Sequence, residues 1–159
     1  MSINVAPPPL QVPAEFGVDK IKAAFFNGLL NTIYQLWSAT YSLRSTATVK
    51  TSDATTTGLV NIEVPTDKTV MIQADIVARR TGGGGSAGDS AWYSLRGAYK
   101  NVGGTLTGVG TPSLTGGEDV VGWNVGFSTS GTSAVVVVLG AGTTEITWEG
   151  SFNVFTVGA

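Results

Sequence analysis

The first hydrophobic pattern along the chain has the period of an α-helix and lies near the N-terminus. Apolar side chains recur at steps of three and four residues from about residue 18 to residue 38, and Lys20, Lys22 and Asn31 lie among them on much of the other side. We therefore expect a helix within the segment 17–42. The apolar positions that mark it are Val18, Ile21, Phe25, Phe26, Leu29, Leu30, Ile33 and Trp37.

The apolar stripe of this helix is too wide for a helix that stands alone in water. The stripe could pack on the β domain of its own chain. It could also join a short bundle of helices from several copies, or enter a socket on another protein, and we favour these last two interpretations taken together. Gly28 would allow a close contact between helices, although it costs about 1 kcal/mol relative to alanine.

From about Leu43 onward the period of the pattern changes to two, which is typical of half-buried antiparallel strands. Alternate residues are apolar in 70–78 and in 146–154, and turns rich in glycine separate the runs. The run 134–139 is apolar throughout, which indicates a central strand or one covered on both faces by a neighbouring copy. The predicted strands are 44–50, 59–64, 70–79, 91–100, 120–128, 134–139 and 145–157.

These patterns predict a mainly β fold: an N-terminal extended arm and one α-helix followed by an antiparallel β-sandwich that is jelly-roll-like. We expect an extended Pro-rich arm at 1–16, an anchoring helix at 17–42 and a β-sandwich domain at 43–159. The arm is predicted from Pro7, Pro8 and Pro9, which favour the polyproline II conformation. It is either a disordered tail or an arm held by a partner or a sister copy, and we favour the held arm.

Composition and charge narrow the class of protein. Only 13% of the residues are charged, against about 25% in an average domain, which favours a surface that is partly covered in an assembly. A net charge of −2 gives no reason to expect binding to nucleic acid. No basic region precedes an apolar run at the N-terminus, and the predicted helix is too polar for membrane insertion. We expect synthesis in the cytoplasm.

Candidate chemistry is sparse in this sequence. The chain contains no cysteine and no histidine, so the commonest nucleophiles, bases and metal ligands are missing. Glu145 and Glu149 lie too far apart along one strand for a glycosidase pair, and Glu118 and Asp119 are adjacent in a turn-like segment. No loop has the spacing of a calcium site. We therefore expect no catalytic residue, no metal, no cofactor and no enzymatic activity.

Two groups of residues are candidates for a ligand or interface surface. Arg79 and Arg80 precede a run of four glycines that could cradle an anion, although a flexible hairpin loop with charges at the strand end explains the run more simply. The alternation places Trp92 and Arg96 on one face of their strand, opposite Tyr93. Most of the aromatic residues in this region suit a core or a subunit interface, and Trp92 is the best candidate for an exposed aromatic side chain.

Two stretches of the chain resemble structural proteins of tailed bacteriophages. The opening APPPLQVPAEFGVDKIKAAFFNGLLNTIYQLWSAT resembles the N-terminal anchoring segments of small virion proteins. The stretches TVMIQADIVARRTGGGGSAGDSAWYSLRGAYKNVGG and GWNVGFSTSGTSAVVVVLGAGTTEITWEGSFNVFTV resemble a β domain found at the ends of phage tail-fibre proteins. The resemblance implies a virion structural component that is commonly trimeric and has no catalytic activity. The long shaft of a typical fibre is missing here.

We therefore expect a phage virion protein of the tail-fibre or fibre-adaptor type, located in the tail or neck region and made in the host cytoplasm. Its expected partners are other virion proteins (a tail or neck ring, or a longer fibre), further copies in a homotrimer, and a host surface glycan. A capsid decoration or head-fibre protein and a carbohydrate-binding receptor module are alternatives. The predicted assembly interface comprises Pro7, Pro8, Pro9, Val12, Phe16, Ile21, Phe25, Phe26, Leu29, Leu30, Ile33 and Trp37.

Overall fold

The computed structural model describes residues 27–32 and 45–158. The chain divides into two units, Met1–Ser42 and Leu43–Ala159, which are described separately. In the first unit, residues 27–32 form a short helix in which the Thr32 hydroxyl donates a 2.9 Å hydrogen bond to the Gly28 carbonyl. The predicted arm and the rest of the predicted helix lie outside the described residues. Within these residues, no helix is long and apolar enough to cross a membrane.

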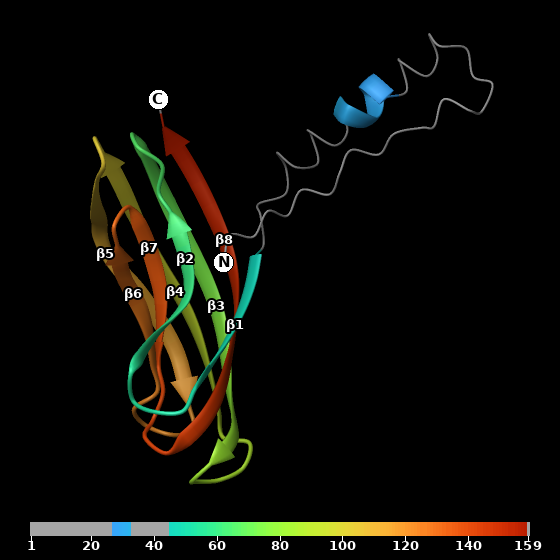
Figure 1. Cartoon of the computed structure of the whole chain (residues 1–159), viewed down its shortest axis with the longest axis vertical. Coiled ribbons are helices and arrows are strands. Elements are labelled where there is room, and N and C mark those ends of the chain that lie inside the picture. The colour runs from blue at the N-terminus through green and yellow to red at the C-terminus, as the bar shows by residue number, and fades with distance from the viewer. Residues whose placement is uncertain (1–26, 33–44, 159) are drawn as a thin grey trace, which may run out of the picture. The chain divides into compact units, whose positions relative to one another are not determined.

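The second unit consists of eight β-strands (Figure 1). Short turns join most consecutive strands, as the glycine and proline positions of the sequence predict. The strands are β1 (Ser45–Thr51), β2 (Thr56–Glu63), β3 (Lys68–Gly83), β4 (Ser90–Val102), β5 (Thr105–Glu118), β6 (Asn124–Ser130), β7 (Ser133–Leu139) and β8 (Thr144–Gly158).

The strands form two antiparallel sheets, which confirms the predicted mainly β fold class. The five-stranded sheet has the order β1-β8-β3-β4-β5, and the three-stranded sheet has the order β2-β7-β6. The first strand of the domain pairs with the last, β1 with β8, and the second pairs with the next to last, β2 with β7. The apolar run at 134–139 forms the centre of the smaller sheet, as predicted.

Both sheets contribute side chains to one hydrophobic core. The predicted alternation is confirmed in β3, where every second residue from Val70 to Ala78 is buried, and in β8, where Ile146, Trp148 and Phe152 are buried. From the smaller sheet, Val136 and Val138 join the same cluster. Among residues 45–158, no strand covers the opposite face of the larger sheet, and the candidate site lies on that face.

Strand β5 is an element that the alternating pattern does not predict. Thr105–Glu118 contains Pro112 and four glycines, lies at the edge of the sheet beside β4, and has nearly all of its residues exposed. The sequence pattern predicts glycine-rich turns between the strands, but Gly116 and Gly117 lie within this strand, so that prediction is wrong here. An edge strand with no buried face shows no alternation of apolar and polar residues. Its glycines and proline are typical of a loop, so the sequence does not predict a strand here.

Candidate functional site

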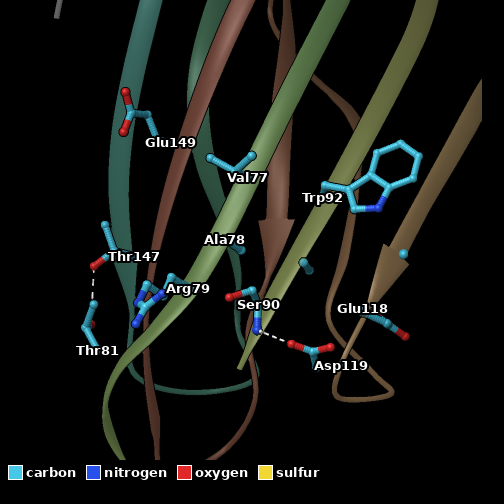
Figure 2. A pocket seen from close by; sticks show the side chains of 12 residues that line it. Val77, Ala78, Arg79, Thr81, Ser90, Trp92, Glu118, Asp119, Thr147 and Glu149 are labelled. Atoms are coloured by element: carbon cyan, nitrogen blue, oxygen red, sulfur yellow. Dashed lines mark hydrogen bonds between the residues drawn. The ribbon is translucent and has the colours of Figure 1, made fainter. Parts of the chain in front are cut away.

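An open groove of about 810 Å³ lies on the outer face of the five-stranded sheet (Figure 2). The pairing of the strands builds it from two rows of side chains that cross the sheet. The first row runs from Glu149 on β8 through Val77 on β3 and Trp92 on β4 to Gly117 on β5. The second row runs from Thr147 through Arg79 to Ser90, beyond which Asp119 follows β5.

Trp92 and Val77 give the groove an apolar surface. The Trp92 side chain is 54% exposed and Val77 is 57% exposed, since both point away from the core. A Cβ atom at Gly117 would lie 3.1 Å from the indole nitrogen of Trp92, so the indole lies directly against a residue that has no side chain. Gly117 thus lets Trp92 rest on the edge strand while much of its ring remains exposed to solvent.

Arg79 and Glu149 give the groove two side chains of opposite charge. Both side chains are exposed, and within the described residues neither forms an ion pair or a side-chain hydrogen bond. Arg79 lies close to Gly88, where a Cβ atom would be 3.2 Å from its Nη2 atom. In Figure 2 the two side chains come from neighbouring strands on the same side of the sheet. A hydrogen-bond donor and an acceptor are therefore both available to a ligand.

Hydrogen bonds fix the edge of the groove beside β5. The Ser90 backbone N–H donates to Asp119 Oδ2 at 2.9 Å, and the Asp119 N–H donates to the Ser90 carbonyl at 3.0 Å. On the other side of the groove the hydroxyl oxygens of Thr81 and Thr147 are 3.3 Å apart. These contacts fix the end of β3, the start of β4 and the residues that follow β5. The groove is therefore defined by the fold.

Glu118 lines the groove, but its carboxylate is already bound by other groups. The Tyr93 hydroxyl donates to Glu118 Oε2 at 2.7 Å and also lies 2.9 Å from the Trp123 carbonyl oxygen. The Gly122 N–H lies 3.3 Å from Oε1. Burial raises the pKa of Tyr93 far above its usual value, and the hydrogen bond and the negative charge of Glu118 raise it further, because each disfavours the phenolate.

Arg80 lies on the other side of the sheet from the groove, which corrects its place among the candidate surface residues. It is 7% exposed and its Nη2 atom is 3.0 Å from Asp89 Oδ2. The alternation of β3 turns it inward where Arg79 turns outward. The run of four glycines, Gly82–Gly85, follows Arg80 and packs against it. Gly85 has a φ of 99°, and a Cβ atom there would overlap the Arg80 guanidinium. Gly85 therefore packs against the buried guanidinium of Arg80, whose ion-pair partner Asp89 is partly exposed.

The other candidate residues lie apart from the groove or outside the described residues. Arg96 is exposed on the same face as Trp92, but it contacts Gln73. With the Gln73 amide assigned so that its oxygen faces the guanidinium, that oxygen accepts from Arg96 Nε at 2.7 Å. Leu29 and Leu30 lie in the short helix, with Leu29 45% exposed. Pro7, Pro8, Pro9, Val12, Phe16, Ile21, Phe25, Phe26, Ile33 and Trp37 fall outside the described residues.

Several groove residues were not identified from the sequence. The alternation places Val77 with Arg79 and Glu149 with Thr147, but only the register between the strands brings these pairs beside Trp92. That register is a property of the folded sheet. Among the described residues, no three carboxylates are close enough together to hold a metal ion.

Comparisons with known proteins give distant structural similarity only. No family model matches the chain, and no curated protein matches it. The chain is similar to the tailspike protein of Acinetobacter baumannii phage AM24, with a TM-score of 0.40, 6% identity, and coverage of 73% of this chain and 27% of that one. It is also similar to the tailspike of Acinetobacter phage vB_ApiP_P1, with a TM-score of 0.35, 16% identity, and coverage of 70% and 21%.

A third similar structure is the tailspike protein gp49 from Acinetobacter baumannii bacteriophage Fri1, which is a capsular polysaccharide depolymerase. The TM-score is 0.31 at 16% identity, with coverage of 79% of this chain and 23% of that one. The chain thus spans about a quarter of the length of these tailspikes. Since the Fri1 protein is an enzyme, this finding contradicts the prediction that the present chain has no enzymatic activity, and we withdraw that prediction.

Proposed function

We propose that the chain is a phage tail-associated structural protein that takes part in attachment to the host, with the groove around Trp92 as the contact to a surface glycan. The observation that carries this proposal is the 54% exposed indole of Trp92, which lies in a groove that also contains two charged side chains without a partner among the described residues. A large aromatic side chain that is left exposed in a hollow commonly marks a binding site rather than a packing accident.

The chemistry of the groove suits a sugar ring. The less polar face of a sugar can stack on the indole and on Val77, while its hydroxyl groups exchange hydrogen bonds with groups at the rim. Arg79 supplies donors and Glu149 supplies acceptors, and the hydroxyl groups of Thr81 and Thr147 provide both.

The N-terminal part of the chain carries the proposed attachment to the virion. We propose that the Pro-rich arm at 1–16 and the helix at 17–42 dock onto the tail or neck, and that the chain acts as a short tail fibre or fibre adaptor. The wide apolar stripe of the predicted helix and the resemblance of the opening to virion anchoring segments support this docking. A homotrimer would bury three such stripes on one axis.

Immunogold electron microscopy on virions of the encoding phage tests this proposal. Gold particles on the tail or at its junction with the head would support it. Gold particles spread over the capsid would instead favour a decoration or head-fibre protein, and virions without label would overturn the proposal of a virion component. Antibodies against the folded β domain suit the experiment, because that part of the protein is expected to remain accessible.

A further inference from the structure

One row of side chains on the outer face of the five-stranded sheet is apolar from each strand to the next. The register pairs Phe155 on β8 with Met71 on β3. It continues the row with Ala98 on β4 and Val109 on β5. The three larger side chains of this row are between 41% and 45% exposed. The row therefore presents apolar groups to solvent across four neighbouring strands.

The neighbouring rows of the same face carry charged and polar residues. On one side the next row contains Gln73 and Arg96, and on the other side it contains Thr69 and Lys100, with Val157 at the β8 end. Such polar residues are typical of the solvated face of an antiparallel sheet. Single exposed apolar side chains are common on protein surfaces, whereas a contiguous group of them indicates an interaction surface.

The apolar row is separate from the groove around Trp92 and differs from it in chemistry. Phe155 and Glu149 lie six residues apart on β8, which is about 20 Å at the rise of a strand. The rows that contain Gln73 and Asp75 lie between them. None of the side chains of the apolar row carries an N–H or O–H group, so the row suits an apolar protein surface rather than a glycan.

The N-terminal part of the chain joins the β domain at the end that carries this row. Strand β1 begins at Ser45, opposite Phe152 on β8, and Phe155 lies three residues further along β8. In Figure 1 this is the end at which β8 finishes and β3 begins. Copies that are held together through the predicted helix at 17–42 are therefore tethered at this end of their β domains.

Tethering decides which partner a surface of this size can bind. A stable interface between free proteins buries about 800 Å² of each partner, which is more than one row of partly exposed side chains provides. Between tethered copies the second contact is intramolecular, and the high local concentration makes a small apolar surface sufficient. A second copy of the chain is therefore the partner that fits the row.

We propose that the apolar rows of three copies, each formed by Phe155, Met71, Ala98 and Val109, pack together around the axis of the homotrimer. The inference rests on the proposed homotrimer and adds to it a contact surface on the β domain. Packing the rows together removes their side chains from water, which favours the assembly. The groove around Trp92, at the other end of the sheet, remains accessible to a host glycan.

Photo-cross-linking of the full-length protein tests this contact. The probe is p-benzoylphenylalanine in place of Phe155, which on irradiation bonds to C–H groups within a few ångströms. We expect covalently linked copies on a denaturing gel, and mass spectrometry should place the links in β3, β4, β5 or β8 of another copy. The same probe in place of Trp92 is the matched control, because Trp92 is an exposed aromatic residue of the same face. It should link few copies or none.

A charge placed in the row tests the same surface without a probe. Val109→Glu should raise the concentration at which the trimer dissociates about tenfold, because the carboxylate would be buried without a partner. Thr115→Glu is the matched control, since Thr115 is exposed on the same face of β5 but lies in the row of Asp75. It should leave the dissociation unchanged. Sedimentation of the full-length variants over a range of concentrations makes the comparison.

The possible results separate this interface from the homotrimer on which it rests. A full-length wild-type protein that sediments as a monomer would contradict both. A trimer in which the probe at position 155 links no copies, or links no more than the probe at position 92, would overturn the interface alone. Links from position 155 to residues 1–44 would do the same, because the N-terminal segment would then cover the row. A Val109→Glu trimer as stable as wild type would also reject the interface.

Discussion

One buried polar atom of the core, the indole nitrogen of Trp148, has a specific partner. The indole of Trp148 is fully buried between Tyr93 and Trp123, and its nitrogen donates a 2.9 Å hydrogen bond to the Thr51 hydroxyl. Thr51 is itself 4% exposed, so water cannot replace it as the acceptor. This bond joins β1 to β8 through side chains and ties the largest residue of the core to an edge strand.

Replacing Thr51 tests the value of that bond. Thr51→Val keeps the shape of the side chain but leaves the Trp148 N–H without an acceptor, and we expect it to lower the free energy of unfolding by about 1–3 kcal/mol. Thr51→Ser keeps the hydroxyl and should cost less. Urea denaturation of both variants gives the comparison, and an unchanged stability of Thr51→Val would show that the hydrogen bond does not stabilise the fold.

The raised pKa of Tyr93 gives a pH dependence with a definite sign. Because folding raises this pKa above the unfolded value of 10.0, its stabilising contribution is complete below that pH and is lost as pH rises toward the folded value. We expect the wild-type protein to lose up to about 1.4 kcal/mol more per pH unit than Tyr93→Phe above about pH 10. Urea midpoints from about pH 9 to about pH 11 test this, and parallel curves would contradict it.

Between the two sheets, an individual glycine allows a close approach of elements. Gly97 lies opposite the widest irregularity of the β4–β5 pairing, where residues 110–112 have no partner on β4. On its inner side the ring of Phe127 from β6 packs so closely that a Cβ atom at Gly97 would lie 2.6 Å from it. The same ring makes an edge contact with Tyr99 at a centroid distance of 5.6 Å.

Gly97→Ala is therefore expected to destabilise the protein, by about 1–3 kcal/mol, because a methyl group must displace Phe127. Gly126→Ala on β6 is the matched control. It has no neighbouring atom within 4 Å of the added carbon and should have little effect on stability. Thermal unfolding of the two variants tests this prediction. Equal melting temperatures would show that the sheets can move apart without a loss of stability.

The elements with a buried face are those that the sequence could predict. The pattern of apolar residues identified seven of the eight strands, and its alternation identified the inward faces of β3 and β8. The pattern could not identify β5, because both faces of this strand are exposed. It also missed the burial of Arg80, because a charged residue near the end of a strand is expected to be exposed unless its ion-pair partner, here Asp89, is known. Trp92 was identified by the same alternation, whereas its groove neighbours depend on register.

For the whole molecule, the proposed homotrimer predicts that assembly depends on the helical stripe. We expect the full chain to sediment as a trimer at micromolar concentration. Replacing Leu29 and Leu30 together with glutamate should shift it to monomer, because charges cannot be buried between identical helices without partners. Asn31→Glu adds a charge at a polar position of the same segment and should leave the trimer intact. A stable wild-type monomer would contradict the proposal.

Adsorption of virions to their host tests the central claim most directly. Virions carrying Trp92→Ala should adsorb about tenfold more slowly than wild-type virions, because the loss of stacking is multiplied over several copies. Virions carrying Trp92→Phe should retain most of the rate. Val102→Ala is the control, since Val102 is 62% exposed on the same strand but outside the groove. Normal adsorption of correctly assembled Trp92→Ala virions would contradict a role of the groove in host attachment.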